Sequence, residues 1–269
     1  MIKVNLYEYY SFGYNYYILL NNSFNKSNKE FYEDIVKYAE FISQLDLKVT
    51  KSSLNLQGIN EAIYKLEKLG KGRKKNEIIS EELHNSIIKI LEKTDSTLDA
   101  ELNIKIAFLN DSKRVSNELL TDQIDKLFGK EIFIELPEIA QYDFSEAGKC
   151  LTFDRFTACG FHCLRGTEAV LKLFYEKILN KTATETLTWG NFHQEIEANI
   201  NNGGIIPKPS PELMINLNSL RMYYRNKTQH PQLIYNSDNV QDLLFLCIKT
   251  VNEMIGDLLK RGAIIQIPF

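Results

Sequence analysis

The stretch SDNVQDLLFLCIKTVNEMIGDL, residues 237–258, decides the fold class. Its apolar side chains recur every three or four residues, which is the spacing of one face of an α-helix. The residues on that face are Val240, Leu243, Leu244, Cys247, Val251, Met254, Ile255 and Leu258. Because so continuous a stripe must be covered by other helices, the pattern predicts a long core helix that begins after Ser237 and Asp238.

The preceding hundred residues have related patterns. They predict helices over 143–153, 155–178 and 188–201, and another that begins at Ser210 with Pro211 in its first turn. In the helix over 155–178 we expect an apolar stripe of Phe161, Leu164, Leu171, Tyr175 and Ile178, flanked by the small residues Ala158, Cys159, Gly160, Cys163, Gly166 and Ala169. Small residues let a neighbouring helix approach closely, and the connections are short. An antiparallel bundle of four or five helices follows.

The N-terminal half has helical patterns that are more widely spaced. Residues 29–45 and 58–69 are predicted helices, and a third begins at Ser80 and runs to about Lys93. Residues 1–25 are rich in Tyr, Asn and Phe, and their pattern leaves a strand and an irregular segment both open. Within 99–137, the run EIFIE at 131–135 is compatible with a strand or a loop.

Pro137 interrupts the pattern before the C-terminal helices begin. We therefore predict an all-α protein in two parts. Residues 1–137 form an N-terminal, mainly helical region of unknown role, and residues 138–269 form an antiparallel helical bundle.

Composition limits the possible functions. The net charge of -3 is unusual for a protein that grips long nucleic acids along its surface, so any RNA function must depend on a local site. The four cysteines form no C-x-x-C pair, which favours a reducing compartment. No apolar run is long enough to span a bilayer and no signal peptide is evident, so we expect a cytoplasmic protein without membrane association.

Cofactor motifs are missing from the sequence. It contains neither G-x-x-x-x-G-K-[ST] nor G-x-G-x-x-G, so no cofactor is predicted. Cys159, His162 and Cys163 lack a fourth ligand at a suitable spacing, so no metal site is predicted either. His84 and His193 are expected at the surface, and Trp189, the single tryptophan, is expected in the core.

The segment RMYYRNKTQHPQ, residues 221–232, carries the residue types for phosphodiester chemistry. His230 can exchange a proton near neutral pH, and the planar guanidinium of Arg225 matches phosphate oxygens. Asn226 can hydrogen-bond the phosphate or orient the histidine. In an unbroken helix Arg225 and His230 lie about 140° apart, but Pro231 disfavours helical geometry at His230, so a bend can bring them together. The alternative is a capping arginine beside a surface histidine.

A second set of polar residues lies on the helix over 155–178. His162, Arg165 and Glu168 are spaced three apart among small and apolar residues. Either they face the Arg225–His230 segment as substrate-binding groups, together with Lys227, or Arg165 and Glu168 simply pair along the helix. The basic run EKLGKGRKKN at 67–76 is likewise open to two interpretations, a phosphate contact and a solvated loop.

The motif Arg225-Asn226-x-x-x-His230, set between the last helices of a bundle, resembles the signature of the HEPN superfamily (higher eukaryotes and prokaryotes nucleotide-binding). The resemblance extends to YDFSEAGKCLTFDRFTACGFHCLRGTE at 142–168 and to Thr188-Trp189-Gly190. It covers roughly residues 138–260 and is closest to a bacterial, uncharacterised branch of that superfamily that has an N-terminal helical extension.

This resemblance implies a function as well as a fold. Many HEPN proteins are metal-independent endoribonucleases of bacterial defence or toxin–antitoxin systems, and they usually act as homodimers in which two Arg–His sets line one cleft. By implication Arg225 binds phosphate, His230 is the general acid and base, Asn226 supports both, and a cognate antitoxin or sensor protein is a possible partner. Other members are non-catalytic modules that bind a nucleotide or a protein, so the fold alone leaves both functions open. Some HEPN toxins carry a modified aromatic residue two positions after the histidine, where this chain has Gln232.

Overall fold

The structure is a computed structural model that describes residues 6–106, 111, 113–230 and 232–264. Helices make up nearly all of its regular structure, and an isolated β-bridge joins Ser27 to Ile78. No β-sheet forms within the described ranges, which confirms the prediction of an all-α fold. None of the described helices combines the length and the apolar character needed to cross a membrane.

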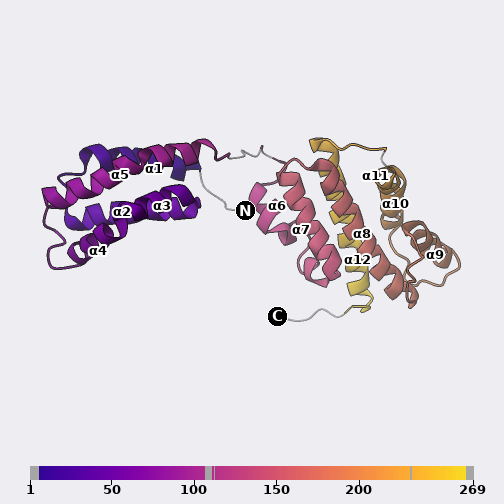
Figure 1. The fold of residues 1–269 in the computed structure, drawn as a ribbon. Helices are drawn as coiled ribbons and strands as arrows, with labels where there is room; N and C mark the ends of the chain where they lie inside the picture. The colour runs from indigo at the N-terminus through magenta and orange to yellow at the C-terminus, as the bar shows by residue number, and fades with distance from the viewer. Residues whose placement is uncertain (1–5, 107–110, 112, 231, 265–269) are drawn as a thin grey trace. The chain divides into compact units, whose positions relative to one another are not determined.

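The chain divides into two compact units, Met1–Phe108 and Leu109–Phe269 (Figure 1). The boundary therefore lies earlier than the 137/138 position expected from Pro137. Pro137 caps the start of α7 (Glu138–Thr152), and the segment before it belongs to the C-terminal core. That segment contains α6 (Asn117–Asp122) and two short 3-10 turns, η1 (Ile124–Leu127) and η2 (Phe133–Glu135), the second of which lies in the EIFIE run.

The C-terminal unit includes this segment because its apolar side chains are buried there. The buried residues are Leu120, Ile124, Phe128, Ile132 and Leu136. α6 also approaches α7 very closely, since a β-carbon at Gly148 would lie 2.1 Å from the carbonyl oxygen of Leu120. Sequence periodicity did not predict this packing, because the helical turns of the segment are too short to show an apolar spacing.

The N-terminal unit contains α1 to α5. Their bounds are α1 (Leu6–Asn22), α2 (Asn28–Gln44), α3 (Lys48–Leu56), α4 (Ile59–Gly70) and α5 (Glu81–Asn103). The predictions for α2 and α4 are confirmed, as is the start of α5 after Ser80, although α5 continues about ten residues beyond the expected end. Within the region 1–25, residues 6–22 form α1 and residues 23–25 form a turn. α3 was not predicted.

Aromatic packing holds α1 onto the rest of this unit. The rings of Phe12 and Phe41 stack with centroids 3.6 Å apart, and the Tyr16 hydroxyl donates to Asp95 on α5 at 2.9 Å. Ser27 caps α2 through a reciprocal capping box with Glu30, which fixes where α2 begins after the turn.

The C-terminal unit is built around α8 (Phe156–Leu179), which packs against α7 and α12 (Ser237–Lys260) (Figure 1). α9 (Trp189–Asn201) packs on α8, and α10 (Pro211–Ser219) packs on α12 and α9. The predicted capping Ser210 is confirmed, since its hydroxyl accepts from the Leu213 amide at 3.0 Å. α12 begins at Ser237, slightly earlier than expected, with Asn236 as its cap.

The small residues of α8 permit close approach, as predicted. A β-carbon at Gly160 would lie 2.7 Å from the ring of Tyr235, and one at Gly166 would lie 3.1 Å from the ring of Phe144. Phe161 does not belong to the predicted apolar stripe, because 42% of its surface is exposed. It lies on the solvent side of α8, whereas Trp189 is fully buried as expected.

The contact of Gly160 with Tyr235 gives a stability prediction. Gly160→Ala should destabilise the C-terminal unit by about 1–3 kcal/mol, because the added methyl group overpacks the interface with the ring. The matched control is Gly256→Ala in α12, where nothing lies within 4 Å of the added carbon. That substitution should stabilise the unit by about 0.5–1 kcal/mol through helix propensity. Denaturant unfolding followed by circular dichroism measures both, and equal effects would contradict the packing argument.

Candidate functional site at the face of α8 and α11

The segment that carries Arg225 is helical almost to its end. α10 runs without interruption into a π-helical stretch, η3 (Leu220–Arg225), and then into one further turn, α11 (Asn226–Gln229). Asn226 therefore begins the last turn of this helical segment. His230 has extended backbone angles (φ -93°, ψ 119°), in keeping with its place before a proline. Pro231 itself lies outside the described residues.

An ion pair with Glu168 holds Arg225 against α8. Its Nη2 donates to Oε1 of Glu168 at 3.2 Å, and about a quarter of each side chain is exposed. Its Nε is buried without a hydrogen-bond partner among the described residues. A forked guanidinium that makes one long contact retains donors for a second anion.

His230 lies at the exposed end of the same helical turn. Its backbone amide closes the turn by donating to the Asn226 carbonyl at 3.0 Å, while the residue as a whole is exposed, as is Lys227. Within the described residues the His230 imidazole makes no side-chain hydrogen bond. The imidazole is therefore accessible from solvent.

α11 is fixed in place by a buried tyrosine. The hydroxyls of Thr228 and Tyr235 lie 2.7 Å apart, and the Tyr235 ring packs over Gly160 of α8. Burial raises the pKa of Tyr235 to about 12, so its hydroxyl remains protonated and can donate. This contact fixes the turn that separates Arg225 from His230.

His162 and Arg165 turn out to face a different helix. Both bind Asp143 of α7, whose side chain is completely buried. The His162 Nδ1 lies 2.8 Å from Oδ1 of Asp143, and Arg165 donates to both carboxylate oxygens at 2.7 and 2.5 Å. The hydrogen bond to Asp143 also raises the pKa of Arg165. The alternative of a pair between Arg165 and Glu168 is therefore wrong, since each residue has another partner.

The second candidate set is consequently divided between two faces of α8. Glu168 lies six positions after His162, and at about 100° per residue their side chains point about 120° apart. Glu168 alone faces the segment of Arg225. Asp143 was missed from the sequence because a lone aspartate on a predicted helix gives no signal until the neighbouring helix is placed.

Arg221 is a further cation that sequence analysis passed over. It lies one π-helical turn before Arg225 and donates to the side chain of Asn218 at 3.0 Å. A β-carbon at Gly190 would lie 3.2 Å from its Nη1, so the glycine of the Thr188-Trp189-Gly190 motif gives the guanidinium room. The Thr188-Trp189-Gly190 motif therefore contacts the helical segment that leads into Arg225, at Arg221.

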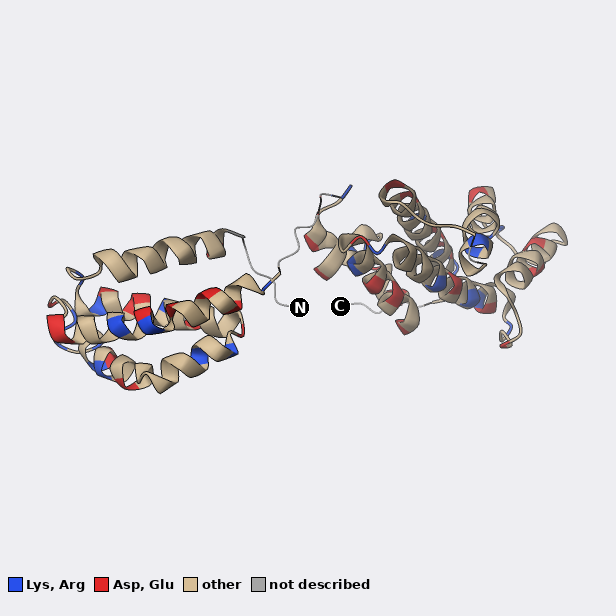
Figure 2. Ribbon diagram, turned by 45° about the horizontal axis from the view of Figure 1, so that its top comes forward, with Lys and Arg blue, Asp and Glu red and all other residues tan. Residues whose placement is uncertain are grey.

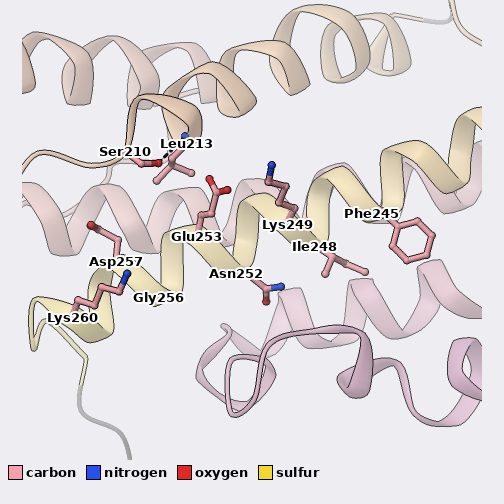
Figure 3. Close-up of a pocket in the computed structure, with 10 residues that line it drawn as sticks. All are labelled: Ser210, Leu213, Phe245, Ile248, Lys249, Asn252, Glu253, Gly256, Asp257 and Lys260. Carbon is pink, nitrogen blue, oxygen red and sulfur yellow. Dashed lines mark hydrogen bonds between the residues drawn. The ribbon is translucent and has the colours of Figure 1, made fainter.

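A large groove lies elsewhere on this unit. It has a volume of about 550 Å³ and runs along α12 beside the start of α10 (Figure 3). Glu253 and Lys249 project from α12 along it, and burial raises the pKa of Glu253. The candidate residues from the sequence do not line it. In the described part of the chain, no group of three or more His, Cys, Asp or Glu is arranged to hold a metal ion.

Comparison with known proteins gives no family assignment. No family model, no curated protein and no solved structure matches this chain.

The Asp143 cluster gives the second prediction. Arg165→Gln should destabilise the C-terminal unit by about 1–3 kcal/mol, because it leaves the buried carboxylate of Asp143 with His162 but without its bidentate partner. Lys172→Gln, which removes an exposed cation from the same helix, should change stability by less than about 0.5 kcal/mol. Thermal and denaturant unfolding of the two variants provide the measurement, and a loss in Arg165→Gln no larger than in Lys172→Gln would show that Asp143 does not need this partner.

Proposed function

We propose that the C-terminal unit is a metal-independent endoribonuclease of the HEPN type, acting as a homodimer in bacterial defence or a toxin–antitoxin system. One observation carries the proposal. A partly exposed guanidinium, Arg225, and an exposed imidazole, His230, bracket a single helical turn that Thr228 and Tyr235 anchor to the bundle. π-helical turns such as the one before Arg225 are also frequent at functional sites.

The proposed chemistry is a transesterification. A neutral His230 imidazole takes the proton of a ribose 2′-hydroxyl, and the 2′-oxygen attacks the adjacent phosphorus. The bond from phosphorus to the 5′-oxygen breaks, and that oxygen takes a proton from an imidazolium, either the same one or that of the second subunit. The products are a 2′,3′-cyclic phosphate and a 5′-hydroxyl. Arg225 stabilises the added negative charge, Asn226 hydrogen-bonds the scissile phosphate or orients His230, and Lys227 contacts the substrate.

The charge distribution supports a local rather than an extended RNA contact. Acidic and basic segments are interspersed along the helices of both units (Figure 2), and the net charge is -3. Affinity then depends on a few positioned groups, so it should respond to single substitutions at those groups.

The nuclease proposal predicts cleavage that requires both residues. Wild-type protein should cleave total tRNA in EDTA, and Arg225→Ala and His230→Ala should each lose at least about a hundredfold in rate, as expected for a general base or a charge stabiliser. Gln229→Ala, an exposed change in the same turn, should retain the wild-type rate. Gel electrophoresis, with end-group analysis for the cyclic phosphate, gives the readout. Cleavage that persists in His230→Ala, or that EDTA abolishes, would refute the mechanism.

The second candidate function is a module that binds a nucleotide or a protein without turnover. The ion pair between Arg225 and Glu168 favours it, because a guanidinium already paired with a carboxylate is partly neutralised. In either function a phosphate must compete with Glu168 for Arg225.

That competition can be measured. Glu168→Gln should tighten binding of a short single-stranded RNA by up to about fivefold, the equivalent of about 1 kcal/mol, because Arg225 loses the carboxylate that competes with phosphate. The matched control is Glu197→Gln, which removes an exposed negative charge from α9 and should have little effect. Fluorescence anisotropy at a fixed salt concentration compares the two. Equal effects would mean that RNA does not bind at Arg225, whereas tightening without cleavage by the wild type would favour the module.

A further inference from the structure

The outward face of α1 carries four tyrosines. Tyr7, Tyr10, Tyr14 and Tyr17 are 68%, 71%, 59% and 61% exposed. The opposite face of the helix holds α1 in place, with Phe12 stacked on Phe41, Tyr16 bonded to Asp95 and Leu19 buried. The tyrosines therefore form an aromatic surface, the tyrosine stripe, that the packing of the N-terminal unit leaves facing solvent.

The spacing of the tyrosine stripe is that of a helix–helix seam. Intervals of three, four and three residues are the a and d positions of a heptad, which keep one line of side chains facing a partner helix. The order of intervals is also the same from either end of the stripe. A second α1 in antiparallel orientation would therefore set Tyr7 opposite Tyr17 of the second copy, and Tyr10 opposite its Tyr14. Such self-complementarity is what a two-fold symmetric interface requires.

The charge of α1 supports a second copy over other partners. Glu8 is the single charged residue among 6–22, and no Lys or Arg occurs there. In Figure 2, α1 is tan along most of its length, whereas α2 to α5 carry blue and red bands. Phosphate backbones and anionic lipid headgroups both attract Lys and Arg, which α1 lacks. In an antiparallel pair the two Glu8 side chains would lie about 12 Å apart along the axis, which limits their repulsion.

The available area suits a weak, reversible dimer. An aromatic side chain buries about 150–250 Å² when it is fully covered, so four that are about two-thirds exposed offer on the order of 500 Å² per copy. Stable interfaces bury about 800 Å² per partner. Gly13 lies near the centre of the stripe, and a β-carbon added there would meet nothing within 4 Å, so two helices have room to approach at this point.

We propose that α1 pairs with α1 of a second copy in antiparallel orientation through the tyrosine stripe. This contact lies in the N-terminal unit and is independent of the proposed ribonuclease site in the C-terminal unit.

Site-directed cross-linking tests the pairing and its orientation. In a Cys150→Ser background, which removes the single native cysteine that is not fully buried, Tyr7→Cys and Tyr17→Cys proteins are prepared separately. On mild oxidation an equimolar mixture should form the 7–17 disulfide far faster than either protein alone forms a disulfide with itself. Rapid self-linking of Tyr7→Cys would overturn the antiparallel arrangement, and no linkage in any combination would overturn the pairing.

Sedimentation equilibrium of the full chain tests the energetics. The double variant Tyr10→Gln, Tyr14→Gln should weaken self-association at least tenfold, whereas Tyr64→Gln, which removes an equally exposed tyrosine from α4, should leave it unchanged. Circular dichroism checks that each variant is folded. An unchanged association constant in the double variant would overturn the proposal, because any dimer would then form elsewhere. A monomeric wild type would also overturn it, and binding of that monomer to phosphatidylcholine vesicles would reassign the stripe to a lipid surface.

Discussion

A carboxylate with no exposure to solvent, that of Asp143, ties α7 to α8 in the C-terminal unit. A buried charge is tolerated only where its partners are well placed, so Arg165 and His162 must both face α7. This requirement sets the rotation of α8 about its own axis. Once that rotation is set, Gly166 lies against Phe144, Gly160 lies under Tyr235, and Glu168 is turned toward the segment of Arg225.

The candidate site depends on this rotation. Because Glu168 faces Arg225, the guanidinium has a defined position at the surface of α8 and does not move freely in solvent. The carboxylate of Glu168 also neutralises part of the positive charge of Arg225 that would attract a phosphate. A site of this kind is positioned in advance but partly masked, and release of Arg225 from Glu168 is the step that either proposed function needs. At the end of the turn, no described residue restrains the side chain of His230 in a comparable way.

Much of the helical framework could be predicted from the sequence, for a physical reason. A helix that buries one face has apolar residues at helical spacing, which can be recognised in the sequence. The expected positions of α2, α4, α8, α9 and α10 are confirmed to within a few residues. Short helical segments have too few residues to show this spacing, so α3, α6 and the boundary between the two units were not predicted. The histidines show the same limit. His84 and His193 were expected at the surface, yet both are buried, with His84 bonded to Ser23 at 2.8 Å and His193 near the Met214 carbonyl at 3.2 Å.

By itself the sequence determined the all-α class, the core faces of the long helices and the short segment in which an arginine and a histidine stand near each other. These depend on local periodicity and on the chemistry of single residues. Only the tertiary structure decided that Arg165 pairs with Asp143 and Arg225 with Glu168. It also decided that four tyrosines of α1 lie exposed on one face. Partner choice depends on how helices rotate and pack against one another, and that arrangement is set by contacts between residues far apart in the chain.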